Sequence, residues 1–377
     1  MNTTPHDELN PPEFELSAAE REHLTLLRRP NSHFIALLGE RESVDGATLH
    51  PKAQWFLETI ARPADTPASL DEEEALMDSA EGRAGIRRFV DRAWALKTRL
   101  GAPLAAVEDR HIPTRGGALP LRIYTPHRRG VDALPLLLYC HGGGWLFGSI
   151  AAVDRALRIL ADEAQAIVVS VDYRLAPEHP YPAAHDDAED AYLWALQHAA
   201  ELGAAPAMVA VGGDSAGAHL AVATSRRQLA AGRPEPLFQL LYYPMLDWDR
   251  GTASFSRFGA GYGLDARFVD VMERLTFPDP ASRQGPEFSH LRAASLAGLP
   301  ATLIATAGYD ILRDQGRAFA RRLETEGVAV TYLEYGTLGH GFMQRSGVYD
   351  DADRACVGTA MAFGQAVRSR RAMLAAG

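Results

Sequence analysis

A serine between two glycines is the residue of this chain best suited to attack a carbonyl carbon. The pentapeptide Gly-Asp-Ser-Ala-Gly, residues 213–217, follows an apolar run at 208–211 and precedes a stretch that favours a helix. A strand, a G-x-S-x-G sequence and a helix in this order are typical of a nucleophile elbow, in which the serine projects from a tight turn. The pattern therefore predicts that Ser215 is a nucleophile, with a purely structural glycine-rich turn as the alternative.

A second glycine-rich tract could supply the hydrogen-bond donors that such a nucleophile needs. The apolar run at 134–140 reads as a buried strand and leads into His-Gly-Gly-Gly-Trp at 141–145. Glycines leave backbone N–H groups unshielded, and fixed N–H donors stabilise the negative charge of a tetrahedral intermediate. In a hydrolase with this elbow, such a tract lies upstream, after the third strand. We therefore predict an oxyanion hole formed by the N–H groups of Gly143, Gly144 and Ala216.

Several motifs together resemble one known family. Over roughly residues 105–370 the chain resembles the hormone-sensitive-lipase family of α/β-hydrolases, chiefly bacterial carboxylesterases. The resemblance implies an α/β-hydrolase fold, with a mostly parallel central sheet flanked by helices and covered by a helical cap. The motifs are HGGGW at 141–145, DYRLAPE at 172–178, YPAA at 181–184, GDSAG at 213–217, YPMLD at 243–247, DILRD at 310–314 and HGF at 340–342.

Chain order indicates the partners of the serine. In this fold the acid follows a late strand, and the base lies on a loop after the last strand. Residues 300–307 read as a strand and precede Asp310, whereas residues 330–335 alternate like the last strand and precede His340. We therefore predict Asp310 as the acid and His340 as the base. Asp314 is a competitor for the acid, but it lies one turn later, where a carboxylate more often serves a helix N-terminus.

These three residues predict acyl transfer to water in two steps. Ser215 would attack the carbonyl carbon while His340 takes its proton, and Asp310 would orient the imidazole and stabilise its charged form. The resemblance implies carboxylic esters with short or medium acyl chains as substrates. Two alternatives remain: a hydrolase of lactones, amides or acetylated natural products with the same triad, and a non-catalytic binding protein on this fold. The presence of all three triad residues favours catalysis.

The expected domain organisation has a catalytic domain preceded by a long extension. Helices are expected at 16–28 and 84–100, and the first seventy residues could form helices packed on the cap, an extra lid or a dimerisation arm, or be partly disordered. Their apolar content exceeds that of a solvated tail, which favours packed helices. The expected segments are an N-terminal extension and cap segment at 1–104 with a polar stretch at 62–72, the catalytic domain at 105–377, and a cap insertion at about 250–292.

Other residues near the motifs have supporting or pocket roles. Trp145, Phe147 and Phe342 are candidates for the wall of the substrate pocket. Asp214 is too close to the serine to orient the base, so we expect it to fix the elbow. Residues 172–178 are expected to form an ion-paired loop that braces the oxyanion tract. Within the resemblance, His290 stands where a proline is common, at the junction between cap and core.

Composition argues against several other functions. The 377 residues carry a net charge of −10 and no block of basic residues, which disfavours nucleic acid or an anionic membrane as partner. We find no apolar run of eighteen residues and a polar start of the chain, so we expect a cytoplasmic protein without membrane insertion. The two cysteines, Cys140 and Cys356, suggest neither a disulfide framework nor a metal site. We expect no cofactor and no metal. By family analogy, a homodimer could form through the last helix, around residues 355–373.

Overall fold

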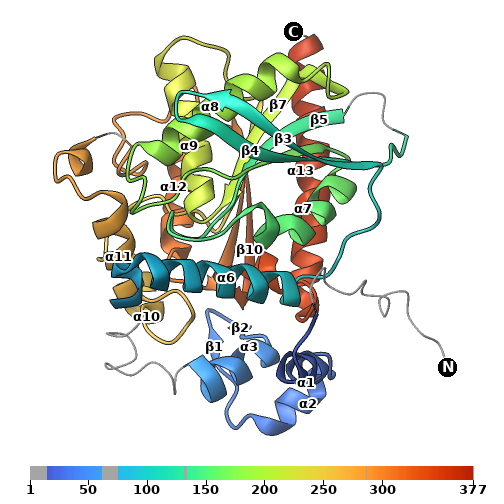
Figure 1. The fold of residues 1–377 in the computed structure, drawn as a ribbon, viewed down its shortest axis with the longest axis vertical. Helices are drawn as coiled ribbons and strands as arrows, with labels where there is room; N and C mark the ends of the chain where they lie inside the picture. The colour runs from blue at the N-terminus through green and yellow to red at the C-terminus, as the bar shows by residue number, and fades with distance from the viewer. Residues whose placement is uncertain (1–14, 62–74, 131–133, 286, 377) are drawn as a thin grey trace.

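The computed structural model describes residues 15–61, 75–130, 134–285 and 287–376, and its centre is an eight-stranded sheet (Figure 1). Strands β5 to β10 pair with one another in parallel, whereas β4 pairs antiparallel with both β6 and the edge strand β3. This arrangement confirms the predicted fold class. In order across the sheet, the strands are β10 (Val330–Gly339), β9 (Ala301–Tyr309), β8 (Phe238–Tyr242), β7 (Ala204–Asp214), β5 (Leu134–Cys140), β6 (Ile167–Val171), β4 (Gly117–Thr125) and β3 (Ala106–Thr114).

Helices cover both faces of the sheet because the inner strands are apolar along their whole length. Every residue of β5, β6 and β9 is buried, as parallel strands packed between two helical layers require. One face packs against α7 (Ile150–Ala164) and α13 (Asp350–Ala376). The other face packs against α8 (Ala183–His198), α9 (Ala216–Ala230) and α12 (Arg313–Thr325). Figure 1 shows the two layers on opposite sides of the sheet.

The cap elements gather at one end of the sheet. In Figure 1, α6 crosses the lower part of the catalytic body, α10 and α11 lie at its lower left, and the N-terminal elements lie below it. Helices were predicted near α1 and α6 and are present, whereas the polar stretch at 62–72 lies outside the described residues. The elements are α1 (Ala18–Leu27), α2 (Asn31–Leu37), β1 (Ser43–Val44), β2 (Ala47–Thr48), α3 (Pro51–Phe56), η1 (Leu57–Ala61), α6 (Ala80–Lys97), α10 (Ala253–Phe258), α11 (Ala266–Thr276) and η2 (Ser282–Gln284).

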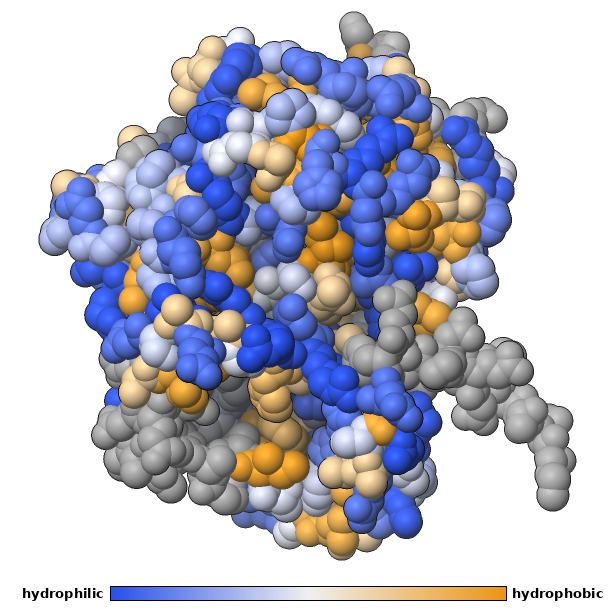
Figure 2. Space-filling view, viewed as in Figure 1, coloured by the Kyte–Doolittle hydropathy of each residue, from blue (hydrophilic) through white to orange (hydrophobic). Residues whose placement is uncertain are grey.

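The surface is mostly polar on the face that Figure 2 displays. Hydrophilic residues are spread over this face, and apolar residues form separate groups between them. In the described part of the chain, no helix combines the length and the apolar content that crossing a membrane requires.

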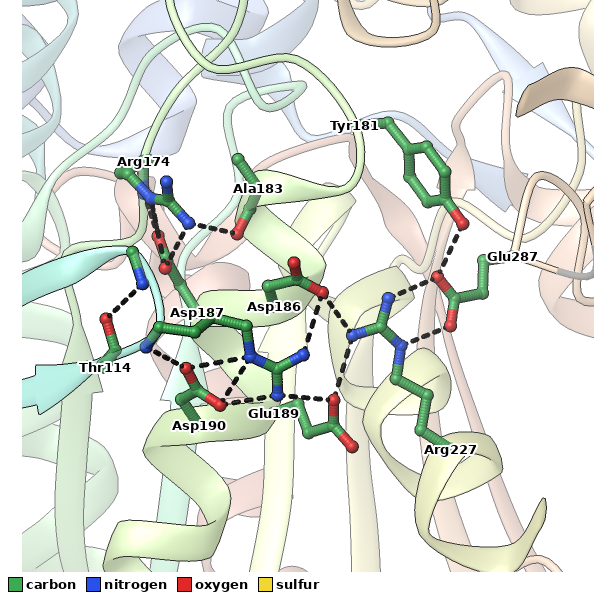
Figure 3. Close-up of polar contacts among 12 residues, drawn as sticks. Thr114, Arg174, Tyr181, Ala183, Asp186, Asp187, Glu189, Asp190, Arg227 and Glu287 are labelled. Atoms are coloured by element: carbon green, nitrogen blue, oxygen red, sulfur yellow. Dashed lines mark hydrogen bonds and ion pairs between the residues drawn. The ribbon is translucent and has the colours of Figure 1, made fainter. Parts of the chain in front are cut away.

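An ion-pair network ties the end of the cap insertion to the core helices (Figure 3). Arg227 of α9 binds both carboxylate oxygens of Glu287, at 2.5 and 2.8 Å, and it also binds Asp186 of α8 at 2.8 Å. Tyr181 donates a hydrogen bond to Glu287 at 3.1 Å. Because Arg227 and Glu287 are largely buried, loss of one partner would leave an uncompensated charge.

Three buried histidines lie beside this network, at the junction of cap and core. The His219 ring is 5.4 Å from the His185 ring and 4.1 Å from the His290 ring, measured between centroids. Burial lowers the pKa of His219 to about 4 and the pKa values of His185 and His290 well below their usual range. All three rings are therefore neutral in the folded protein at neutral pH.

We expect the free energy of unfolding to fall as the pH is lowered from 7 to 5. In the unfolded chain these histidines take up protons near pH 6.5, whereas the folded protein keeps them neutral, so the unfolded state binds more protons. His219 alone should contribute a loss of about 2 kcal/mol at pH 5. Urea unfolding at both pH values measures the effect. Carboxylates with lowered pKa, such as Glu20 and Glu178, titrate below this window.

The matched variant is His290→Gln, which removes one buried imidazole and keeps polar groups for its two hydrogen-bond partners, Arg226 and the carbonyl of His219. It should lose less stability between pH 7 and pH 5 than the wild type. Equal losses in the two proteins, or no loss in either, would contradict this account of the cluster.

Candidate active site

Ser215 lies at the turn between β7 and α9, in a backbone conformation that residues with a side chain rarely adopt. Its φ is 54° and its ψ is −117°, and its N–H donates to the carbonyl of Tyr242 at 2.9 Å. A Cβ atom on Gly217 would lie 1.9 Å from the carbonyl oxygen of Cys140, and one on Gly213 would lie 2.4 Å from the backbone of Gly217. Only glycine therefore fits on either side of this elbow, as the sequence pattern indicated.

The three residues predicted as a triad are joined by hydrogen bonds. His340 Nε2 lies 3.1 Å from Ser215 Oγ, and His340 Nδ1 lies 2.8 Å from Asp310 Oδ2. The other oxygen of Asp310 accepts the N–H of Leu312 at 2.9 Å, which fixes the carboxylate. Asp310 is 1% exposed and the His340 side chain is 15% exposed, so the imidazole is more accessible than the carboxylate with which it pairs.

The competing carboxylate, Asp314, lies elsewhere. It accepts the backbone N–H of Ser254 at 2.8 Å and is near the guanidinium groups of Arg313 and Arg317. This side chain is on the first turn of α12 and connects that helix to the cap insertion. The structure therefore brings Asp310, and not Asp314, to His340.

The glycine tract after β5 turns sharply beside Ser215. Gly143 and Gly144 have φ values of 116° and 62°, in the region that favours glycine. A Cβ atom on Gly144 would lie 2.2 Å from Met272 Sδ, so α11 packs directly on this turn. Within the described residues, no acceptor pairs with the N–H groups of Gly143, Gly144 or Ala216. Ala216 begins α9, where the N–H groups of the first turn have no partner inside the helix.

Asp214 connects the three loops around the site. Its carboxylate accepts the N–H of Gly142 at 2.9 Å, the hydroxyl of Tyr139 at 2.8 Å and the side-chain amide of Gln344 at 3.1 Å. Gly142 belongs to the glycine tract, and Gln344 follows the loop of His340. The expected role in fixing the elbow therefore extends to both neighbouring loops. Tyr139 and Gln344 were not recognised from the sequence, because no motif marks them.

The loop at 172–178 braces the glycine tract, as the sequence led us to expect. The hydroxyl of Tyr173 donates to the carbonyl of His141 at 2.7 Å, and the N–H of Ala176 donates to the carbonyl of Trp145 at 2.9 Å. Glu178 pairs with Arg87 of α6 at 2.8 Å, and this pairing contributes to a lower pKa of that carboxyl, about 2. These contacts link the tract to the cap.

The predicted pocket residues occupy different environments. Trp145 is 1% exposed and stacks on Trp248, and Phe342 is 1% exposed beneath the ring of Tyr243. Phe147 is only partly buried and contacts Phe268 of α11, with ring centroids 5.4 Å apart. Of the three, Phe147 alone keeps part of its surface exposed, whereas the other two are buried in the loops on either side of Ser215.

Among the described residues, a possible metal-binding group and a cysteine thiol also have structural surroundings that account for them. The carboxylates of Asp350 and Asp351 lie near His50 in a group that could hold a metal, but both pair with Arg354. One guanidinium therefore already offsets part of the charge of these two carboxylates. Burial raises the pKa of the Cys140 thiol to about 12, so it stays protonated and is a poor nucleophile.

The variant Asp214→Ala should lower the free energy of unfolding by about 3 kcal/mol, because buried donors on Gly142 and Tyr139 lose their acceptor. Asp214→Asn keeps one acceptor oxygen and should lose clearly less. Urea unfolding of both variants beside the wild type measures the difference. If the two substitutions destabilised the protein equally, these hydrogen bonds would not hold the loops together.

Known proteins are similar to this chain in both sequence and fold. A family model described as the alpha/beta hydrolase fold matches residues 137–344. The carboxylic ester hydrolase LipN of Mycobacterium tuberculosis is 39% identical over 320 residues, which cover 82% of this chain and 81% of that protein. The ethyl acetate hydrolase of Pseudomonas putida is 35% identical over 285 residues, covering 74% of this chain and 89% of that protein.

A solved structure agrees with these relatives. EstE1, a thermophilic and thermostable carboxylesterase cloned from a metagenomic library, has a TM-score of 0.71 and 34% identity, and the match covers 76% of this chain and 97% of that chain. The resemblance noted from the motifs is thereby confirmed. The chain belongs to the α/β-hydrolase family, among the relatives of hormone-sensitive lipase that include bacterial carboxylic ester hydrolases.

Proposed function

We propose that this protein is a serine carboxylic ester hydrolase that works through an acyl-enzyme intermediate. The observation that carries the proposal is the continuous set of contacts from Ser215 Oγ to His340 at 3.1 Å and from His340 to Asp310 at 2.8 Å. A nucleophile next to a base that a third group orients is the arrangement that acyl transfer requires. The ester-hydrolase relatives support the same assignment.

In the first half of the reaction, Ser215 Oγ attacks the ester carbonyl carbon and His340 Nε2 takes the hydroxyl proton. Asp310 holds the proton on Nδ1 and stabilises the imidazolium. The oxyanion of the tetrahedral intermediate accepts hydrogen bonds from the N–H groups of Gly143, Gly144 and Ala216. His340 then donates its proton to the departing alcohol. In the second half, water repeats the attack on the acyl group and the acid is released.

Apolar side chains next to the glycine tract favour neutral esters of modest size. Met272 lies against Gly144, and Phe268 lies against Phe147, so α11 limits the space beside the oxyanion hole. This crowding supports short or medium acyl chains. Lactones, amides and acetylated natural products are the second group of substrates, because the same triad would serve them. The cytoplasmic location and the homodimer stay predictions from the sequence.

Hydrolysis of a p-nitrophenyl ester series from acetate to palmitate tests the reaction and the chain length together. We expect a maximum at short or medium acyl chains, and we expect Ser215→Ala to lower kcat by about 10⁴- to 10⁶-fold. Cys140→Ser is a useful control, since the thiol has no part in the mechanism. An active Ser215→Ala variant would refute the proposed nucleophile.

A pair of carboxylate variants tests the assignment of the acid. Asp310→Asn should lower kcat by about 10⁴-fold, because the amide cannot hold the required tautomer of the imidazole. Asp314→Asn should stay within about tenfold of the wild type, since its polar partners among the described residues belong to α12 and the cap insertion and not to the imidazole. The measurement is kcat on the best ester of the series. The reverse order of effects would move the acid to Asp314.

A further inference from the structure

A small hairpin in the N-terminal extension packs against the loop that holds the triad acid. This N-terminal hairpin, residues 42–49, consists of β1, β2 and the turn between them. Asp45 and Gly46 form the turn with φ values of 53° and 81°. Positive φ at both central residues is typical of the two-residue turns that join tightly twisted hairpins. The hairpin therefore has a defined shape of its own.

Tyr309, the residue immediately before the acid, is anchored in this hairpin. Its hydroxyl lies 2.8 Å from the carbonyl oxygen of Glu42 and 2.9 Å from that of Ala47. One proton can satisfy only one acceptor at a time, so the hydroxyl sits between the two strands of the hairpin and is shared by them. Tyr309 is 1% exposed, so the donor of these bonds is buried, whereas Glu42 and Ala47 are only partly buried.

The hairpin also holds the residues that follow the acid. Arg313 donates to the carbonyl of Gly308 at 3.0 Å and pairs with Asp45 in the hairpin turn, also at 3.0 Å. Arg313 is buried, and its guanidinium lies over the ring of Phe258 from the cap insertion. Contacts from the hairpin thus reach the chain on both sides of Asp310.

The cap insertion is attached to the same point. Tyr262 hydrogen-bonds the carboxylate of Glu42, and its ring stacks near that of Tyr309 with centroids 6.2 Å apart. Phe258 packs against both rings, with centroid distances of 5.0 Å to Tyr262 and 5.7 Å to Tyr309. Three segments that are far apart in the sequence therefore meet at one tyrosine.

We propose that the N-terminal hairpin positions the catalytic acid, with Tyr309 as the positioning residue that transmits the contact. This inference rests on the proposed function, because it assumes that Asp310 orients His340. The backbone at 308–313 sets the direction of the Asp310 carboxylate, whose two oxygens reach Leu312 N–H and His340. Because the hairpin holds that backbone in place, both hydrogen bonds of the Asp310 carboxylate stay aligned. The hairpin thus contributes to the geometry of the active site as well as to the fold.

The test is the pH profile of kcat/KM for Tyr309→Phe, which removes the hydroxyl and keeps the ring. A less well aligned Asp310 stabilises the imidazolium less, so the acidic limb should move to lower pH by about half a unit. In the described part of the chain, the other hydrogen-bond and ring partners of the His340 side chain, Ser215 and Tyr243, carry no charge. We expect kcat to fall about tenfold with KM within twofold, because a small misplacement of a catalytic group affects the chemical step.

Tyr332→Phe is the matched control. This tyrosine lies on β10, and its hydroxyl bonds to Thr306 of β9 and to Glu334, not to the hairpin. The control should leave the acidic limb in place even if it lowers stability. A limb that moves equally in both variants, or in neither, would overturn the proposal. Wild-type hydrolysis of esters with loss of activity in Ser215→Ala would still support the proposed function in that case.

A second variant alters the turn of the hairpin and leaves Tyr309 unchanged. Gly46→Val has open space around it but strains the turn, because valine disfavours a positive φ. It should shift the acidic limb in the same direction, and the double variant with Tyr309→Phe should shift it no further than the larger single effect. Additive shifts, or no shift with Gly46→Val, would show that the hairpin does not act through Tyr309.

Discussion

The close approach of α9 to the end of β5 is the constraint on which the rest of the structure depends. The backbone at Gly213 and Gly217 contacts Cys140 so tightly that no side chain fits. This contact forces Ser215 into a positive φ and directs its hydroxyl away from the sheet. It also places the start of α9 next to the glycine tract, so one packing contact positions both the proposed nucleophile and the proposed oxyanion donors.

Once the elbow is fixed, the other loops must be held at the correct distance from it. Asp214 does this at the centre, by accepting hydrogen bonds from the glycine tract and from Gln344 beyond His340. The N-terminal hairpin holds the loop of Asp310 at the edge of the sheet, through its contacts with Tyr309 and Arg313. Each triad loop therefore has a brace that belongs to a different part of the chain. Buried bonds of this kind are costly to break singly, which favours one geometry.

The features that sequence alone predicted are local. A strand, a glycine-flanked serine and a helix follow one another directly, so Ser215 could be found from spacing, and chain order extended this to Asp310 and His340. The braces could not be found in this way. Tyr309 contacts a hairpin more than 250 residues earlier, and His185, His219 and His290 meet only after folding. Trp145 and Phe342, expected in the pocket wall, are buried because their loops turn the rings inward.

Covalent labelling of Ser215 tests the central claim most directly. The protein is treated with a p-nitrophenyl alkylphosphonate, which reacts with an activated serine and mimics the charge of the tetrahedral intermediate. Mass spectrometry of the digested protein then locates the label. The account predicts one equivalent of p-nitrophenol released and one phosphonyl group on Ser215, with labelling strongly slowed in His340→Ala. Label on another residue, or labelling of Ser215 that does not depend on His340, would contradict it.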